Sequence, residues 1–303
     1  MVNENDAAPL RRQVMRFGLF VLGLLACFAR PFYALSQYSL HSEFFSYIPL
    51  IPIISLYLVS LQRSELPGKA SASWQWAVMA ALAGFALLAG WAWALHSGWK
   101  PHPEDHMTLM TAAFLLFVVA GCFAFFGYTI TRLLAFPIAF LIFMIPMPTV
   151  MLDGITTFFQ QTSAFTATVF LKTAGMAVFR ENLIIHMPGF SIWVAPECSG
   201  IHSTMVLLIT AVLAGHMFLR SGWKRALLVV VVVPLAILRN GFRIFVVSEL
   251  CVQISHSMIN SPVHHRGGPI FFALSLIPFF GLLFLLRKSE LREPTTVKTP
   301  AKV

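Results

Sequence analysis

The chain has 303 residues, of which 58% are hydrophobic and 11% are charged, with a net charge of +9 and a mean hydropathy of +0.78. A soluble domain carries about 25% charged residues to cover its surface, so this composition excludes an ordinary soluble protein and indicates one that faces lipid. The basic residues lie in short clusters between apolar runs rather than along one polar face, which excludes nucleic acid as the partner.

Apolar runs of membrane-spanning length recur along the chain. A bilayer core about 30 Å thick needs roughly 20 apolar residues in a helix, and lipid cannot satisfy open backbone, which favours helices over strands. The sequence therefore predicts an all-α integral membrane protein with about eight transmembrane helices, near residues 17–32, 44–61, 74–95, 109–128, 133–148, 200–219, 226–250 and 269–286. A single membrane domain, residues 14–287, then lies between a cytoplasmic tail, residues 1–13, and a basic cytoplasmic tail, residues 288–303.

The charges of the connecting loops predict the orientation. With eight spans, the basic segments fall on one side of the membrane, and short cytoplasmic loops are rich in Lys and Arg. We therefore expect both chain ends inside, in a multi-pass protein of the cytoplasmic (inner) cell membrane. The basic residues of this side are Arg11, Arg12, Arg16, Arg63, Lys69, Arg132, Arg220, Lys224, Arg225, Arg287, Lys288, Arg292, Lys298 and Lys302.

The segment between Pro148 and Cys198 fits no simple span and is placed on the outer side. Thr156–Ala177 is rich in Thr and Phe and predicts an amphipathic or re-entrant helix, with a further membrane crossing as the alternative. Asn182–Ala195 alternates between apolar and polar residues around Pro188-Gly189, a pattern typical of a short β-hairpin. This hairpin comes directly before the start of the sixth span.

Cys198 is the first candidate for a chemical role, because it lies in a polar motif at the outer start of the sixth span. Thiols react as thiolates, which helix N-termini and nearby cations favour. The alternative interpretation is a packing cysteine at a helix cap, with Ser199 as the capping residue.

Polar residues also interrupt the seventh span. At 1.5 Å per residue, Arg243 stands about 25 Å above Ala226, which places it just below the outer surface and level with Cys198. Arg239 lies one helical turn deeper on the same face, and Asn240 is a neighbouring position. Either arginine alone could reach the interface by extending its side chain, but two arginines and an asparagine on one stripe indicate a polar cavity.

Histidines complete the candidate site. His264 and His265 precede the eighth span in the last outer loop, and an imidazole there suits general acid–base chemistry. His202, one turn from Cys198, is the competing base. A thiolate, a histidine and a cationic donor supply the nucleophile, the proton shuttle and the oxyanion stabiliser of acyl transfer. No ligand spacing indicates a metal, and no cofactor is expected.

Several motifs in order resemble the exosortase/archaeosortase family of membrane cysteine transpeptidases. They cover roughly residues 40–287. The matching segments are Phe136-Pro137 through Pro146-Met147-Pro148, Ala195-Pro196-Glu197-Cys198-Ser199-Gly200, Asn240-Gly241-Phe242-Arg243-Ile244, and His264 ahead of Gly268 and Phe271-Phe272.

The resemblance implies cleavage of a C-terminal sorting signal from exported, membrane-anchored proteins. Such signals contain a short motif (Pro-Glu-Pro in bacterial substrates), a transmembrane helix and a basic tail. Cys198 would form a thioacyl intermediate, Arg243 would stabilise the oxyanion or thiolate, and His264 would be the general acid and base. The acceptor would be an amine, a lipid or a glycan.

Some residues depart from the family pattern. His265 adjoins His264, and Arg266 follows at a place where archaeal relatives use an arginine, so either is an alternative third catalytic residue. Arg239 stands where relatives often have a small apolar residue, which makes it a candidate for lining the substrate pocket.

Two other classes of protein remain as alternatives. A membrane transporter would explain the arginines but predicts polar groups near mid-membrane in several helices, whereas here they cluster outward. A non-catalytic membrane assembly factor would keep the fold without turnover. Another intramembrane hydrolase is disfavoured, because the sequence has neither paired aspartates nor a His-Glu-x-x-His motif.

Overall fold

The computed structural model describes residues 4–41, 45–68, 71–253 and 268–292, most of which are helical. The chain divides into two compact units, Met1–Leu152 and Asp153–Val303, here called the first and the second unit. The elements up to the boundary are α1 (Glu4–Cys27), α2 (Ala29–His41), α3 (Leu50–Leu61), η1 (Arg63–Glu65), α4 (Trp74–His96), α5 (Pro103–Phe125), α6 (Gly127–Leu133), α7 (Ala135–Phe140) and η2 (Leu141–Met144). Beyond them follow α8 (Thr149–Thr173), β1 (Phe179–Glu181), β2 (Ile184–Met187), β3 (Phe190–Trp193), η3 (Pro196–Ser199), α9 (Ile201–Phe218), α10 (Gly222–Gln253) and α12 (Gly268–Arg292).

The helices confirm an all-α membrane protein, but with fewer clear spans than predicted. In the described part, five helices are long and apolar enough to cross a membrane: α4, α5, α9, α10 and α12. Two further pairs count only if each bent pair is one span, because α1 and α2 meet at 77°, and α6 and α7 at 68°. The remaining predicted span, residues 44–61, corresponds to α3, whose 12 residues reach about 18 Å, well short of a bilayer core. The structure thus gives five to seven candidate spans instead of about eight.

Aromatic side chains hold the first unit together. Phe17 of α1 and Phe126 lie with their ring centroids 5.0 Å apart, and Phe32 of α2 meets Phe114 of α5 edge to face at 4.7 Å. Such edge-to-face pairs add to the free energy gained by burying the rings. Polar contacts also join elements of this unit, and in one of them Ser55 of α3 donates a hydrogen bond to the carbonyl of Pro137 at 2.8 Å.

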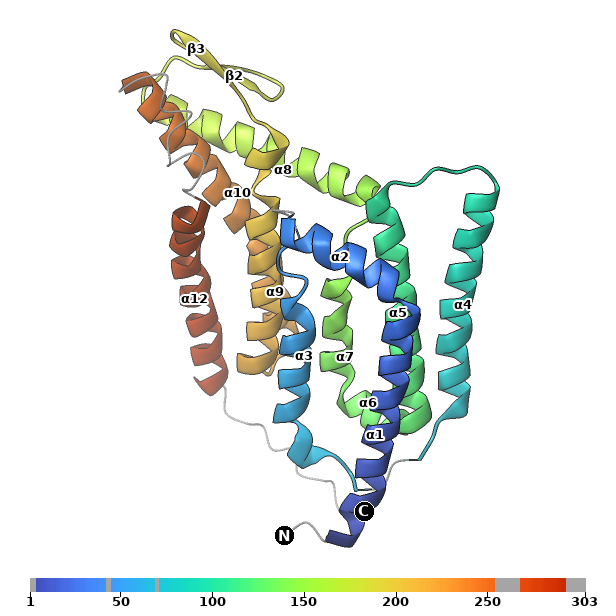
Figure 1. Ribbon diagram of the computed structural model, residues 1–303. Coiled ribbons are helices and arrows are strands. Elements are labelled where there is room, and N and C mark those ends of the chain that lie inside the picture. Colours follow the sequence, from blue (N-terminus) through green and yellow to red (C-terminus); the bar gives the residue numbers. More distant parts are fainter. Residues whose placement is uncertain (1–3, 42–44, 69–70, 254–267, 293–303) are drawn as a thin grey trace, which may run out of the picture. The chain divides into compact units, whose positions relative to one another are not determined.

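Helix α8 covers most of the Thr/Phe-rich segment and runs across the direction of α9 and α12 (Figure 1). It is absent from the candidate spans found in the described residues. It approaches α10 closely, because a Cβ atom on Gly241 would stand only 2.6 Å from Cγ2 of Thr166. Glycine at this position therefore allows the two helix backbones to touch.

Two apolar clusters form the core of the second unit. In one, α9, α10 and α12 contribute buried residues such as Leu207, Leu228 and Phe279. In the other, Ala164 of α8 and Ile185 of the sheet pack with residues of α10. The second cluster packs the sheet against α8 and α10. The position at which the chain leaves β3 is therefore fixed relative to these two helices.

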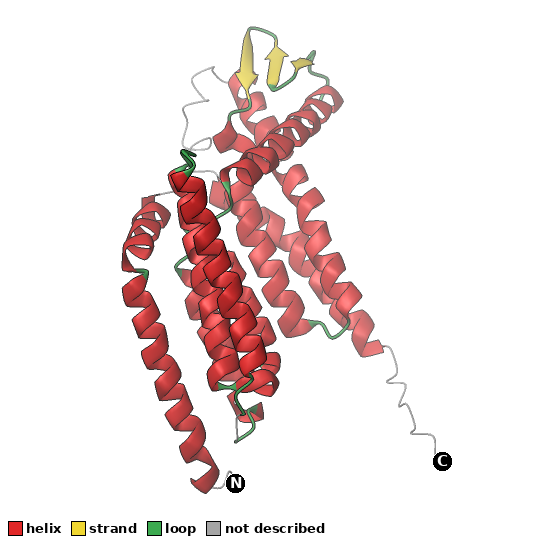
Figure 2. Cartoon of the chain, turned by 90° about the vertical axis from the view of Figure 1, so that its right-hand side faces the viewer, coloured by secondary structure: helices red, strands yellow, loops and turns green. Residues whose placement is uncertain are grey.

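The predicted hairpin is present and gains a third strand. β2 and β3 pair antiparallel around Pro188-Gly189, and β1 pairs with the other edge of β2, so the sheet order is β1-β2-β3. Figure 2 shows these strands gathered at one end of the second unit.

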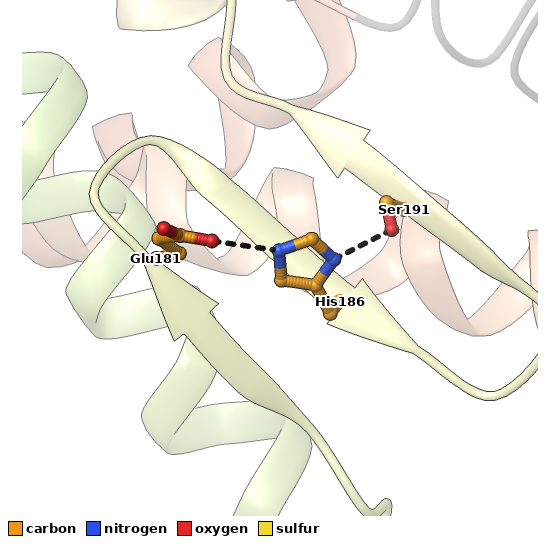
Figure 3. A network of polar contacts seen from close by, with 3 residues as sticks. All are labelled: Glu181, His186 and Ser191. Carbon is orange, nitrogen blue, oxygen red and sulfur yellow. Dashed lines mark hydrogen bonds and ion pairs between the residues drawn. The ribbon is translucent and has the colours of Figure 1, made fainter.

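A polar network lies on the sheet surface (Figure 3). The Nδ1 atom of His186 is 2.8 Å from Ser191 Oγ, and its Nε2 atom is 3.6 Å from a carboxylate oxygen of Glu181. The side chains of His186 and Glu181 are 41% and 67% exposed. An ion pair this long and this exposed contributes little to stability and ties neighbouring strands together.

Candidate active site

The chain turns sharply between β3 and α9, and Cys198 lies in this turn, Pro196–Gly200, which we call the cysteine turn. The Cys198 amide donates a hydrogen bond to the Ala195 carbonyl at 2.9 Å. Gly200 has a left-handed backbone with φ of +71°, a conformation that other residues adopt at a cost. A Cβ atom there would also stand 3.0 Å from Asn240 Oδ1 and 3.2 Å from an Arg239 nitrogen. The turn therefore depends on glycine for both conformation and space.

The structure corrects the expected relation of Cys198 to the sixth span. Cys198 belongs to the short helix η3, and α9 begins three residues later at Ile201, with Gly200 as its N-cap. The expectation that Cys198 occupies the first turn of the long helix is therefore wrong. The alternative with Ser199 as the capping residue is also wrong, because the α9 cap has no side-chain hydrogen bond. Ser199 Oγ is buried and has no hydrogen-bond partner among the described residues.

Asn240 of α10 fixes the backbone of the cysteine turn. Its Nδ2 group donates to the Cys198 carbonyl at 2.6 Å and to Ser163 Oγ of α8 at 3.0 Å. Asn240 is 2% exposed and Ser163 is fully buried. Buried hydrogen bonds of this kind restrict their partners to one arrangement, so one amide holds the turn against α8 and α10.

Cys198 and Arg243 line the same cavity, which has a volume of about 90 Å³. Asn240 contributes a third polar wall, and the remaining walls are Ile192, Trp193, Val194, Ala195, Ile244 and Val247. Cys198 itself is partly exposed. The cavity is thus a small, mostly apolar hollow that is lined by both a cysteine and an arginine.

Arg239 takes a different place from the one expected for it. It does not line this cavity. One of its nitrogens, Nη2, donates to the Gly200 carbonyl at 3.1 Å and to Thr204 Oγ1 at 3.3 Å. Arg239 and Arg243 are four residues apart, which rotates one side chain about 40° from the other, and this rotation separates a residue behind the turn from one in the cavity.

Of the candidate catalytic bases, the structure describes His202 alone. His202 lies in the first turn of α9, where its Nδ1 atom is buried with no hydrogen-bond partner in the described part of the chain, and it does not line the cavity. His264, His265 and Arg266 lie outside the described residues. Among the residues that are described, no group of three or more His, Cys, Asp or Glu could hold a metal ion.

Sequence reasoning missed the contribution of α8. Gln160 donates to the Val194 carbonyl at 2.9 Å, just ahead of the cysteine turn, and Ser163 accepts from Asn240. These two residues are three positions apart and therefore share one helix face. That spacing of polar residues in an apolar helix was the available signal, but it names no partner.

One comparison with known proteins finds a match. No curated protein and no solved structure matches the chain. The model of one family, described as transmembrane exosortase (Exosortase_EpsH), matches residues 38–281, a range that contains both Cys198 and Arg243. Since this range is most of the 303 residues, the resemblance seen in the motifs is confirmed, and the chain belongs to the transmembrane exosortase family.

Proposed function

We propose that this protein is a cysteine transpeptidase that cleaves the C-terminal sorting signal of exported proteins and transfers them to an acceptor. The observation that carries the proposal is that Cys198 and Arg243 line the same cavity. A nucleophile beside a cationic donor is the minimum that acyl transfer through a thioester requires. Family membership supports the same chemistry.

The first half of the reaction breaks the substrate chain. The Cys198 thiolate attacks the carbonyl carbon of the scissile peptide and forms a C–S bond, while Arg243 stabilises the negative charge that develops on the carbonyl oxygen. The C–N bond then breaks, the leaving amine takes a proton from the general acid, and the C-terminal fragment departs. The exported protein remains as a thioester on Cys198.

The second half transfers the exported protein. An amine, or a hydroxyl of a lipid or a glycan, attacks the thioester carbonyl and gives its proton to the general base, and Cys198 leaves as a thiolate. We assign the acid–base role to His264, with His265 and His202 as alternative bases, and Arg266 is the alternative third catalytic residue, which would act by its charge. Asn240 holds the Cys198 backbone during both steps, and neither step requires a metal or a cofactor.

We further propose the arrangement in the membrane. One membrane domain, residues 14–287, crosses the cell membrane eight times with both ends inside, so that the cavity opens on the extracytoplasmic side. For this count each bent helix pair is one span, and the short helix α3 would cross together with the mostly apolar residues 45–49 that precede it. The partners are membrane-anchored substrates with sorting signals, together with the surrounding lipids.

The test is co-expression with a substrate that carries a Pro-Glu-Pro motif, a transmembrane helix and a basic tail, followed by mass spectrometry of the new C-terminus. We expect a truncated product joined to the acceptor, and a loss of at least about 1000-fold for Cys198→Ala, as is usual when a nucleophile is removed. Cys27→Ser is the matched control, because Cys27 is an exposed cysteine of the first unit. Full processing by both Cys198→Ala and Cys198→Ser would refute the proposal.

A further inference from the structure

Arg239 is a buried cation that has no anionic partner. It is 8% exposed, and its Nη1 nitrogen has no hydrogen-bond partner among the described residues. No carboxylate forms an ion pair with it in the described part of the chain. Burying an arginine without an opposite charge is unfavourable, so such a residue in a membrane protein indicates a function.

The Gly200 carbonyl does not need the hydrogen bond from Arg239, because other donors already satisfy it. The Gly200 carbonyl already accepts from the Thr204 amide at 3.0 Å, from Thr204 Oγ1 at 2.8 Å and from Ser203 Oγ at 3.0 Å. Arg239 Nη2 is a fourth donor to the same oxygen, at 3.1 Å. What Arg239 alone brings to this carbonyl is a positive charge, two residues along the chain from the Cys198 thiol.

We propose that Arg239 is a positioning residue. It bonds to the Gly200 carbonyl of the cysteine turn and, through its uncompensated charge, favours the thiolate form of Cys198. The proposal deepens the proposed function and rests on it. Arg243 acts from inside the cavity on the substrate oxyanion, whereas Arg239 acts through the Gly200 backbone and never touches substrate. The low polarity around Arg239 strengthens its field at the turn.

Few charged groups among the described residues lie close enough to favour or oppose the thiolate form of Cys198. On α10 these are Arg239 and Arg243, and on α9 the nearest titratable residue is His202. The α8 residues that contact the turn or its approach, Gln160 and Ser163, are uncharged. The two arginines are therefore the groups able to favour the thiolate at neutral pH.

The experiment measures the rate at which neutral iodoacetamide alkylates Cys198 as a function of pH, in the purified full-length protein, by mass spectrometry of the Cys198 peptide. Arg239→Gln keeps a donor to Gly200 but removes the charge, and Arg239→Lys keeps the charge. We expect Arg239→Gln to move the midpoint of the profile up by about one pH unit, which slows alkylation about tenfold at neutral pH. Arg239→Lys should stay within about threefold of the unsubstituted protein, and Cys27 serves as the internal reference.

The outcomes separate this proposal from the proposed function. A profile for Arg239→Gln that coincides with that of the unsubstituted protein would overturn the role of the charge, and so would an Arg239→Lys profile displaced as far as that of Arg239→Gln. Alkylation needs no substrate, so it reports on Arg239 even if the reaction is another one. Failure of the proposed function would show instead as complete substrate processing by Cys198→Ala.

Discussion

The interiors of the two units differ in how they use polar side chains. In the first unit the buried side chain of Ser55 bonds to a single backbone carbonyl, that of Pro137, and joins α3 to α7. In the second unit, Ser163, Thr204, Arg239 and Asn240 are all buried and their contacts converge on the five residues of the cysteine turn. One interior joins helices to one another, and the other shapes a loop.

The two kinds of interior also differ in how well they tolerate substitution. Apolar packing of the kind found between α1, α2 and α5 needs only matching shapes and tolerates substitution of similar volume. A buried polar network is stable only if nearly every member finds a partner. Buried polar atoms without a partner occur in both units among the described residues, and those of the second unit include Ser199 Oγ and Arg239 Nη1, which lie in or against the cysteine turn. We therefore expect the same type of substitution to reduce substrate processing more in the second unit than in the first.

The largest effect is expected from Gly200→Ala, set against Gly84→Ala in the first unit. The new Cβ at Gly200 would press on Asn240 and on a backbone with positive φ, and the resulting displacement of Cys198 should reduce substrate processing at least about 100-fold. At Gly84 the nearest atom, 3.1 Å away, is the tip of the Phe117 ring, which is able to shift. We expect Gly84→Ala to leave processing unchanged in the same co-expression assay; equal losses for both variants would contradict the comparison.

Asn240→Ala is expected to have the second-largest effect on substrate processing. It removes the donor to both the Cys198 carbonyl and Ser163, so we expect processing to fall by about 10- to 100-fold and the free energy of unfolding to fall by about 1–3 kcal/mol. Thermal unfolding in detergent and the processing assay measure the two effects. Ser163→Ala is the matched control, because it removes only one contact of the same amide, and its loss of activity should be clearly smaller.

Ser55→Ala is expected to change stability alone. The variant loses one buried hydrogen bond to the Pro137 carbonyl, worth about 1 kcal/mol of unfolding free energy. Processing should stay within about twofold of the unsubstituted protein, because the lost bond joins two helices of the first unit. A loss of processing without a loss of stability would show that the first unit also shapes the site.

The smallest effect is expected on the surface of the sheet. Ser191→Ala and Glu181→Gln remove contacts of His186 that are largely exposed. Exposed pairs of this kind contribute less than about 1 kcal/mol, so both the unfolding temperature and processing should be unchanged within error. A marked loss of processing by either variant would reveal that the sheet takes part in substrate binding.

Local patterns predicted the elements well, because hydropathy and turn chemistry act over a few residues. The apolar runs at 74–95, 200–219 and 226–250 correspond to α4, α9 and α10, and the Pro188-Gly189 turn joins β2 to β3. The bends between α1 and α2 and between α6 and α7 were not predicted, since hydropathy measures the composition of a run and not its direction. The third strand, β1, was missed because three residues carry too little periodicity to indicate a strand.

The sequence by itself determined that this is a membrane protein of helices with a cysteine motif and an arginine motif, because composition and short motifs need no partner to be read. Only the tertiary structure decided that Arg243 shares a cavity with Cys198 while Arg239, one turn away, bonds to Gly200 behind it. It also decided that α8 supplies Gln160 and Ser163 to the surroundings of the cysteine turn. Contacts between residues 34 to 77 positions apart depend on how the helices pack, and no local pattern encodes that packing.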